Sequence, residues 1–170
     1  MAMALTVGQF LNSHHIDFSL TKHRHTDTSY SSAVSAHVPT SQVAKAVMLK
    51  DRNDDLLMAV VPSNRRVMIN KINQMTGKQY YLIGEHELST IFQDCEPGAV
   101  PSLGQAYQVN MIIDDALWEQ EEVYVEAGDH ENLVHLEGKQ FHKLMHGVEH
   151  KNISGYRFTP AHDGRNWEWE

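Results

Sequence analysis

The chain has 170 residues, of which 41% are hydrophobic and 21% are charged. This length suits one domain with its own core, and this composition argues against disorder, collagen-like repeats and coiled coil. The net charge of −8, from 14 Lys and Arg against 22 Asp and Glu, disfavours a broad non-specific grip on duplex nucleic acid but allows a local contact with a nucleic-acid end.

The first half of the chain alternates predicted helices with predicted strands. In order these are a helix around residues 7–11, a strand over 16–20, a helix over 30–38 and two strands over 43–49 and 56–61. We expect Thr6 to cap the first helix and Pro39 to end the second. The polar residues 51–55 join the two later strands into a hairpin, and the apolar character of both strands predicts burial on two faces.

The second half contains more strands. In order we expect a helix over 70–75, a strand over 80–83, a helix over 85–92, strands over 108–114, 122–127 and 132–136, and a helix over 141–146. Gly77 closes the first of these helices. Residues 96–104 contain two prolines and two glycines, which predict an ordered loop. The mixture of helices and strands indicates an α+β fold.

The chain divides into a folded domain, residues 1–146, and a C-terminal extension, residues 147–170. Hydrophobic periodicity fades after residue 146, where Gly, Asn, Ser, Pro and Asp become frequent. Four aromatic residues nevertheless lie in the extension: Tyr156, Phe158, Trp167 and Trp169. We therefore expect the extension to dock on the domain or on another subunit.

The sequence predicts a cytoplasmic protein with no membrane partner. Its apolar runs are far shorter than a membrane span, and residues 1–5 lack the basic and apolar regions of a signal peptide. The one cysteine, Cys95, excludes an internal disulfide and suits a reducing compartment. No nucleophile motif surrounds Cys95, so we expect a small buried apolar residue.

Lys45 is the most informative single residue, because it interrupts an apolar strand. Strand alternation places it on the same face as Val47 and Leu49. A half-buried ammonium in this setting is suited to hold an anionic or carbonyl group of a substrate. The alternative is a lysine at the mouth of the strand whose side chain reaches water.

The segment 98–104, Gly-Ala-Val-Pro-Ser-Leu-Gly, is the second candidate for chemistry. Glycines and a fixed proline let backbone N–H groups converge on an oxyanion or a phosphate. The alternative is a tight connection between a helix and a strand. Ser102 lacks the G-x-S-x-G context of a serine hydrolase.

The twelve histidines raise the question of a metal site. His142, His146 and His150 follow a spacing that stacks imidazoles on one helical face, but Gly147 is expected to end the helix between them. We expect a solvated face here. The other histidine pairs, such as His23 with His25 and His130 with His135, lack a neighbouring cysteine or carboxylate cluster, so the sequence predicts no metal and no cofactor.

The ordered set of motifs resembles one family. After Lys45 come Ala-Val-Val-Pro-Ser-Asn-Arg-Arg over 59–66, the segment 98–104, Val-Asn-Met-Ile-Ile-Asp over 109–114 and Val-Tyr-Val-Glu-Ala-Gly over 123–128. This order is similar to that of the YbaK/prolyl-tRNA synthetase-associated domain family, the trans-editing aminoacyl-tRNA deacylases, over about residues 5–146. The resemblance implies a mixed, barrel-like β-sheet flanked by helices, which agrees with the α+β pattern.

The resemblance also implies an activity. It is hydrolysis, in trans, of the ester that joins a wrongly attached amino acid to the 3′-terminal adenosine of a tRNA. The implied partner is the 3′ end of an aminoacyl-tRNA, with an aminoacyl-tRNA synthetase as a second candidate. The lysine of the family maps onto Lys45, and its Gly-x-x-Pro-type loop maps onto Gly98, Ala99 and Pro101, with Gly104 completing the turn. The reaction needs no protein nucleophile, because a water activated by the 2′-hydroxyl of the substrate or by ordered polar groups can attack the ester.

The resemblance gives a broader expectation for the substrate pocket. Residues near Tyr30, Met48, Met58 and His135 are expected to line it, together with Ser102 and Gly104 of the loop. Ser102 and Leu103 stand where many relatives have Pro-Phe. This departure leaves room for an alternative function, a non-catalytic tRNA- or nucleotide-binding regulatory module of the same fold.

Overall fold

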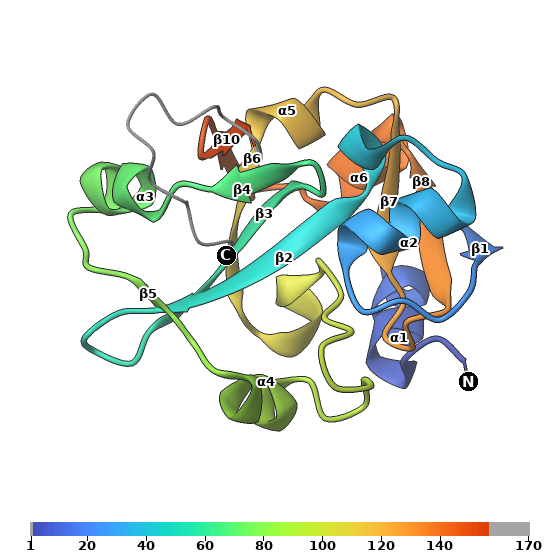
Figure 1. Ribbon diagram of the computed structural model, residues 1–170, viewed down its shortest axis with the longest axis horizontal. Coiled ribbons are helices and arrows are strands. Elements are labelled where there is room, and N and C mark those ends of the chain that lie inside the picture. The colour runs from blue at the N-terminus through green and yellow to red at the C-terminus, as the bar shows by residue number, and fades with distance from the viewer. Residues whose placement is uncertain (1, 157–170) are drawn as a thin grey trace, which may run out of the picture.

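A computed structural model describes residues 2–156 of the chain (Figure 1). The helices are α1 (Leu5–Ser13), α2 (Ser29–Ala36), α3 (Ile69–Thr76), α4 (Glu85–Ile91), α5 (Asp115–Trp118) and α6 (Gly138–Leu144), with 3-10 turns η1 (Thr40–Gln42) and η2 (Gly104–Tyr107). The strands are β1 (Ser19–Lys22), β2 (Ala44–Lys50), β3 (Leu56–Pro62), β4 (Arg65–Val67), β5 (Tyr81–Leu82), β6 (Asn110–Asp114), β7 (Glu122–Glu126), β8 (Asn132–Glu137), β9 (Glu149–Lys151) and β10 (Ser154–Tyr156).

The strands form three sheets, which confirms the predicted α+β class. The largest has the order β5-β2-β3-β6-β9, a second has the order β1-β8-β7, and β10 pairs with β4. The largest sheet is mixed, because β3 pairs antiparallel with β2 and parallel with β6. Strand pairing within residues 2–156 leaves these sheets separate rather than closing a barrel, and one bridge, Val43 to Tyr124, links the first two.

The predicted central hairpin is confirmed as β2 and β3, which cross the middle of the molecule (Figure 1). Both of its faces are covered, as the apolar runs predicted. Met48 and Met58 are opposite each other across the two strands and belong to the larger core cluster. Val47 and Leu49 point into a second cluster, on the other face of the sheet. Close packing on both faces therefore makes the hairpin a rigid support for the residues at its ends.

Local signals set the ends of several elements as expected. The Asp51 carboxylate accepts the backbone N–H groups of Asn53 and Asp55 at 2.8 and 2.9 Å, which closes the polar turn of the hairpin. Gly77 ends α3 with φ +71°, a left-handed conformation that glycine adopts at little cost. Thr28 is the N-cap of α2, and its hydroxyl accepts the N–H of Ser31.

The predicted cap of the first helix is wrong. Ala4, not Thr6, is the N-cap residue of α1, and its side chain supplies no hydrogen bond. The N–H of Thr6 donates instead to the Asp94 carboxylate at 2.8 Å. A partner distant in sequence thus satisfies an open helix-end donor, which local sequence cannot reveal.

The described part of the predicted extension is built into the sheets. β9 adds to the large sheet beside β6, and β10 pairs with β4. Tyr156 is 66% exposed, and the Arg65 guanidinium lies 4.8 Å from the centre of its ring. Phe158, Trp167 and Trp169 lie outside the described residues.

None of the helices within residues 2–156 combines the length and the apolar character that crossing a bilayer requires.

Candidate functional site

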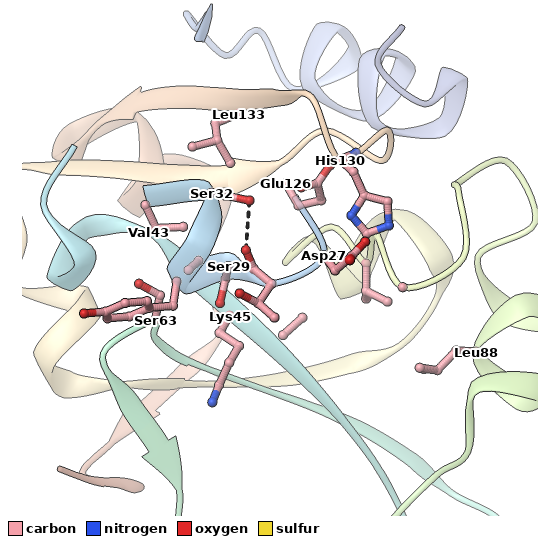
Figure 2. Close-up of a pocket in the computed structure, with 16 residues that line it drawn as sticks. Asp27, Ser29, Ser32, Val43, Lys45, Ser63, Leu88, Glu126, His130 and Leu133 are labelled. Atoms are coloured by element: carbon pink, nitrogen blue, oxygen red, sulfur yellow. Dashed lines mark hydrogen bonds between the residues drawn. The ribbon is translucent and has the colours of Figure 1, made fainter. Parts of the chain in front are cut away.

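A cavity of about 340 Å³ lies where the first residues of β2 meet the start of α2 (Figure 2). Two loops complete its wall, the Gly98 loop (residues 96–104) and the turn between β7 and β8. The lining residues are Asp27, Thr28, Ser29, Tyr30, Ser32, Val43, Ala44, Lys45, Ala46, Ser63, Leu88, Gly98, Val100, Glu126, His130 and Leu133. This volume falls within the range of small-molecule sites.

Lys45 enters the cavity from the beginning of β2. It is half-buried, and its neighbours Ala44 and Ala46 also line the cavity (Figure 2). Strand pairing fixes its position, because Lys45 lies opposite Val61 of β3. Because side chains alternate along a strand, the small Ala44 and Ala46 border the cavity from the face of β2 opposite to the Lys45 side chain.

The start of α2 forms the opposite wall through a chain of hydroxyl groups. Thr26 bonds to the Ser32 hydroxyl at 2.7 Å, and Ser32 in turn donates to the carbonyl oxygen of Thr28 at 3.0 Å. These bonds fix the first turn of the helix, where Ser29 and Tyr30 border the cavity.

The Gly98 loop contributes two residues to the cavity wall whose backbone N–H groups have no partner within the described residues. Gly98 has φ +81°, in the left-handed region that favours glycine. Gly98 and Val100 both line the cavity, and within residues 2–156 neither of their N–H groups donates a hydrogen bond. The N–H of Ala99 between them donates to the Glu96 carbonyl oxygen at 2.9 Å. The amides available to a ligand are therefore those of Gly98 and Val100.

His130 anchors this loop from the turn after β7. Its Nε2 lies 2.7 Å from the carbonyl oxygen of Pro97. A carbonyl oxygen only accepts, so Nε2 carries the proton. His130 adopts φ +60°, and the Glu126 carboxylate stabilises this tight turn by accepting the N–H groups of Gly128, Asp129 and His130 through Oε1.

A second carboxylate locks the same turn. Burial disfavours the charged form of Asp129, but bonds from the N–H of Glu131 and from the side-chain amide and N–H of Asn132 outweigh it and hold the pKa of Asp129 below its usual value. The turn that carries His130 is thus built on two hydrogen-bonded carboxylates.

The structure brings three of the sequence-predicted residues together on one cavity: Lys45, Gly98 and Tyr30. The rest of the predicted loop lies beneath it. Ala99, Pro101 and Ser102 are buried, and the Ser102 hydroxyl has no hydrogen-bond partner within the described residues. Gly104 is buried where a Cβ would fall 2.7 Å from Met111 Cγ and 2.9 Å from the Val109 carbonyl oxygen, so close packing accounts for this glycine.

Three other predicted pocket residues lie elsewhere. Met48 and Met58 are 4% and 0% exposed, inside the core, and do not line the cavity. His135 shares a face of β8 with Leu133, which does line it, but lies two residues further along, or about 7 Å at the rise of a strand. His135 contacts the Glu122 carboxylate, stacks on Tyr124 and borders a separate cavity.

The sequence reasoning missed Asp27, Glu126 and His130 as lining residues. His130 was visible only as part of a turn and as one of twelve histidines. In the structure, the carboxylates of Glu126 and Asp129 hold the turn that carries His130. In the sequence, these two acids look like any other surface acids, so the pattern does not identify the turn.

The C-terminal histidines form a different arrangement. The His142 and His150 rings both stack on the Trp118 ring, with ring centres 4.0 and 4.6 Å away. His142 also bonds to the Trp118 carbonyl oxygen, and His150 to Asp115. No group of three His, Cys, Asp or Glu side chains within residues 2–156 is placed to hold a metal ion.

Cys95 is half-buried beside Tyr107. Burial raises the pKa of its thiol to about 12, and the nearby Asp94 carboxylate adds to this effect. Because the thiolate is the nucleophilic form, this environment suppresses the reactivity of Cys95 near neutral pH.

Solved structures share this fold. Hypothetical protein APE2540 has a TM-score of 0.78 at 19% identity, covering 88% of this chain and 99% of that chain. A structure described as a candidate trans-editing enzyme for prolyl tRNA synthetase has a TM-score of 0.75 at 17% identity, covering 88% and 95%. A structure described as a candidate signal transduction protein from Marinobacter aquaeolei VT8 has a TM-score of 0.72 at 17% identity, covering 88% of this chain and 30% of that longer chain. At these identities the likeness shows the fold alone.

The sequence comparisons identify the family. A comparison with curated proteins finds no match. Residues 23–144 match the family described as the aminoacyl-tRNA editing domain. That range includes every residue that lines the cavity. The resemblance noted from the motifs is thereby confirmed, and the chain belongs to the aminoacyl-tRNA editing domain family.

Proposed function

We propose that this protein hydrolyses, in trans and in the cytoplasm, the ester bond of a mischarged aminoacyl-tRNA. The observation that carries the proposal is the meeting of Lys45 and Gly98 on one cavity, although they come from distant parts of the chain. A cationic side chain and open backbone amides are suited to bind a carbonyl group on which negative charge develops. Membership of an editing family supports the same substrate class.

In the proposed reaction, the aminoacyl ester enters the cavity with its carbonyl oxygen toward the Gly98 loop. The N–H groups of Gly98 and Val100 stabilise the oxyanion that forms when water attacks the carbonyl carbon. Lys45 orients the terminal adenosine or the carbonyl group. The C–O ester bond then breaks, and the 3′-oxygen of the adenosine takes up a proton and leaves as a hydroxyl.

The attacking water loses its proton to the 2′-hydroxyl region of the substrate or to ordered polar groups of the cavity. An aminoacyl ester is already reactive, so correct placement and oxyanion stabilisation supply the main catalytic effect. His130 supports the reaction indirectly, because its bond to Pro97 fixes the residue that precedes Gly98.

A deacylation screen tests this proposal. Purified protein is mixed with tRNAs that each carry a mischarged small amino acid, and the loss of the aminoacyl group is followed against a protein-free control. We expect at least one mischarged tRNA to be deacylated well above the spontaneous rate. Binding of aminoacyl-tRNA without any hydrolysis would favour the regulatory module instead.

A further inference from the structure

We propose that Asp27 binds the free α-ammonium group of the aminoacyl substrate and makes the site selective for an unmodified amino acid. The inference rests on the proposed function for the identity of the ligand. It concerns a residue that lines the same cavity as Lys45, on the wall formed by the start of α2 (Figure 2).

Most polar side chains of the cavity wall already have partners in the protein. The hydroxyls of Thr28 and Ser32 bond within the first turn of α2, and the Ser63 hydroxyl donates to the carbonyl oxygen of Thr40. Oε1 of Glu126 accepts three backbone N–H groups. Nε2 of His130 is bound to Pro97. These groups shape the cavity and hold its loops.

Asp27 differs from them. Asp27 is an exposed residue at the mouth of the cavity, directly before the N-cap residue of α2, and within residues 2–156 no hydrogen bond or ion pair engages its carboxylate. Figure 2 draws it on the side of the cavity that also carries His130 and Glu126. A carboxylate in this state can accept hydrogen bonds from a ligand without first breaking a bond inside the protein.

The charges around the cavity favour a cationic group on the ligand. Apart from His130, the acidic and basic lining residues are one cation, Lys45, and two anions, Asp27 and Glu126. An aminoacyl ester brings an α-ammonium group next to its carbonyl carbon. If the carbonyl oxygen faces Gly98, a carboxylate on the same cavity is the natural acceptor for that ammonium. An N-acylated or deaminated substrate would lose this bond.

Binding of two matched, uncleavable probes tests the inference. Both probes are built on 3′-amino-3′-deoxyadenosine, whose 3′-nitrogen carries either an alanyl or a lactyl group in amide linkage. They differ only at the α-carbon, where the alanyl probe has an ammonium group and the lactyl probe has a hydroxyl group. A charge-assisted hydrogen bond predicts that wild-type protein binds the alanyl probe about tenfold to a hundredfold more tightly. In Asp27→Asn protein this ratio should fall close to one.

Asp17→Asn is the control, because Asp17 is an exposed carboxylate like Asp27 but lies on the separate cavity near His135. It should keep the wild-type ratio. An unchanged ratio in Asp27→Asn, or no preference by the wild-type protein, including no binding of either probe, would overturn the inference. If Asp27 only supports the start of α2, Asp27→Asn should weaken the binding of both probes equally, and this result would also contradict the inference. Deacylation is measured separately: normal probe selectivity without ester hydrolysis would refute the proposed function and leave the role of Asp27 in place.

Discussion

The imidazole of His130 donates from Nε2 to the carbonyl oxygen of Pro97 at 2.7 Å, which ties the turn after β7 to the residue before Gly98. The centre of the His25 ring lies 5.0 Å from that of the His130 ring, and Nε2 of His25 is 3.5 Å from the Glu96 carboxylate. Two histidines therefore hold two successive residues of the Gly98 loop. The position of the Gly98 loop at the cavity is therefore set by contacts from residues far away in the sequence.

Replacing Lys45 with alanine should remove most of the deacylase activity and leave the fold intact. The side chain is half-buried at the cavity wall, so its loss removes a substrate contact rather than core packing. Loss of a charge-assisted bond predicts a fall in kcat/KM of about tenfold to a hundredfold. Lys45→Arg should also be impaired, because a planar guanidinium does not replace a compact ammonium. Deacylation kinetics with thermal melting provide the measurement.

Lys50→Ala is the matched control for this prediction. Lys50 lies at the other end of β2 and pairs with Glu87 at 2.9 Å, away from the cavity. A partly exposed ion pair contributes little to stability, so the melting temperature should change little and activity should remain. Full activity in folded Lys45→Ala protein would refute the assignment of the site.

Replacing Gly98 with alanine should reduce activity far more than stability. A Cβ at Gly98 would lie 3.7 Å from His130 Cε1, an ordinary contact, so the strain comes from φ +81°. Left-handed geometry costs a non-glycine residue about 1–2 kcal/mol, which the loop can relieve by moving its amides. Losing an oxyanion donor costs on the order of a hundredfold in kcat. Gly98→Val should behave in the same way.

Gly77→Ala separates backbone strain from catalysis. Gly77 has φ +71° with no atom within 4 Å of an added Cβ, and it ends α3 away from the cavity. Both glycine variants should therefore lose a similar, small amount of melting temperature, and only Gly98→Ala should lose activity. If the activity of Gly98→Ala simply follows its folded fraction, the loop is structural and the oxyanion donors lie elsewhere.

Local sequence predicted the elements whose ends depend on nearby residues. The hairpin turn at Asp51 and the end of α3 at Gly77 follow from bonds and backbone angles within a few residues. The cap of α1 could not be predicted in this way, because Asp94, from a distant loop, accepts the hydrogen bond of the Thr6 N–H group. Likewise, β9 and β10 are three residues long and exist through pairing with β6 and β4 rather than through an apolar pattern of their own.

The site shows the same division. Lys45 stood out because a charge interrupted an apolar strand, and Gly98 because of the composition of its loop. The sequence alone does not tell which histidine lines the cavity. The register of β8 and the turn before it place His130 and Leu133 at the cavity and leave His135 outside it. Met48 looked like a pocket residue until pairing with Met58 placed it in the core.

The turn that holds His130 should become less stable in acid. Hydrogen bonds hold the pKa of Asp129 below the ordinary aspartate value of 3.8, so the charged form stabilises the folded state. This contribution is fully present above pH 3.8 and is lost as the pH falls below it. Urea unfolding of wild type and Asp129→Asn should show a stability difference at pH 7 that shrinks toward pH 3. A difference that is constant across this range would contradict the assignment.

Chelation should not affect deacylation. His142 and His150, two of the three histidines that share a helical spacing in the sequence, both stack on the Trp118 ring, and no closed set of metal ligands surrounds them within residues 2–156. Protein treated with a chelator is therefore expected to hydrolyse ester at the untreated rate. A loss of activity that zinc restores would contradict this prediction.

We expect the cavity between Lys45 and Gly98 to hold the aminoacylated adenosine. The most direct measurement is a crystal structure of the protein with an uncleavable, amide-linked 3′-aminoacyl adenosine. We expect the aminoacyl carbonyl oxygen within hydrogen-bond distance of the Gly98 and Val100 N–H groups, and the Lys45 ammonium on the adenosine or on the carbonyl group. Finding the analogue in another place, such as the cavity beside His135, with the Lys45 cavity empty, would contradict the account.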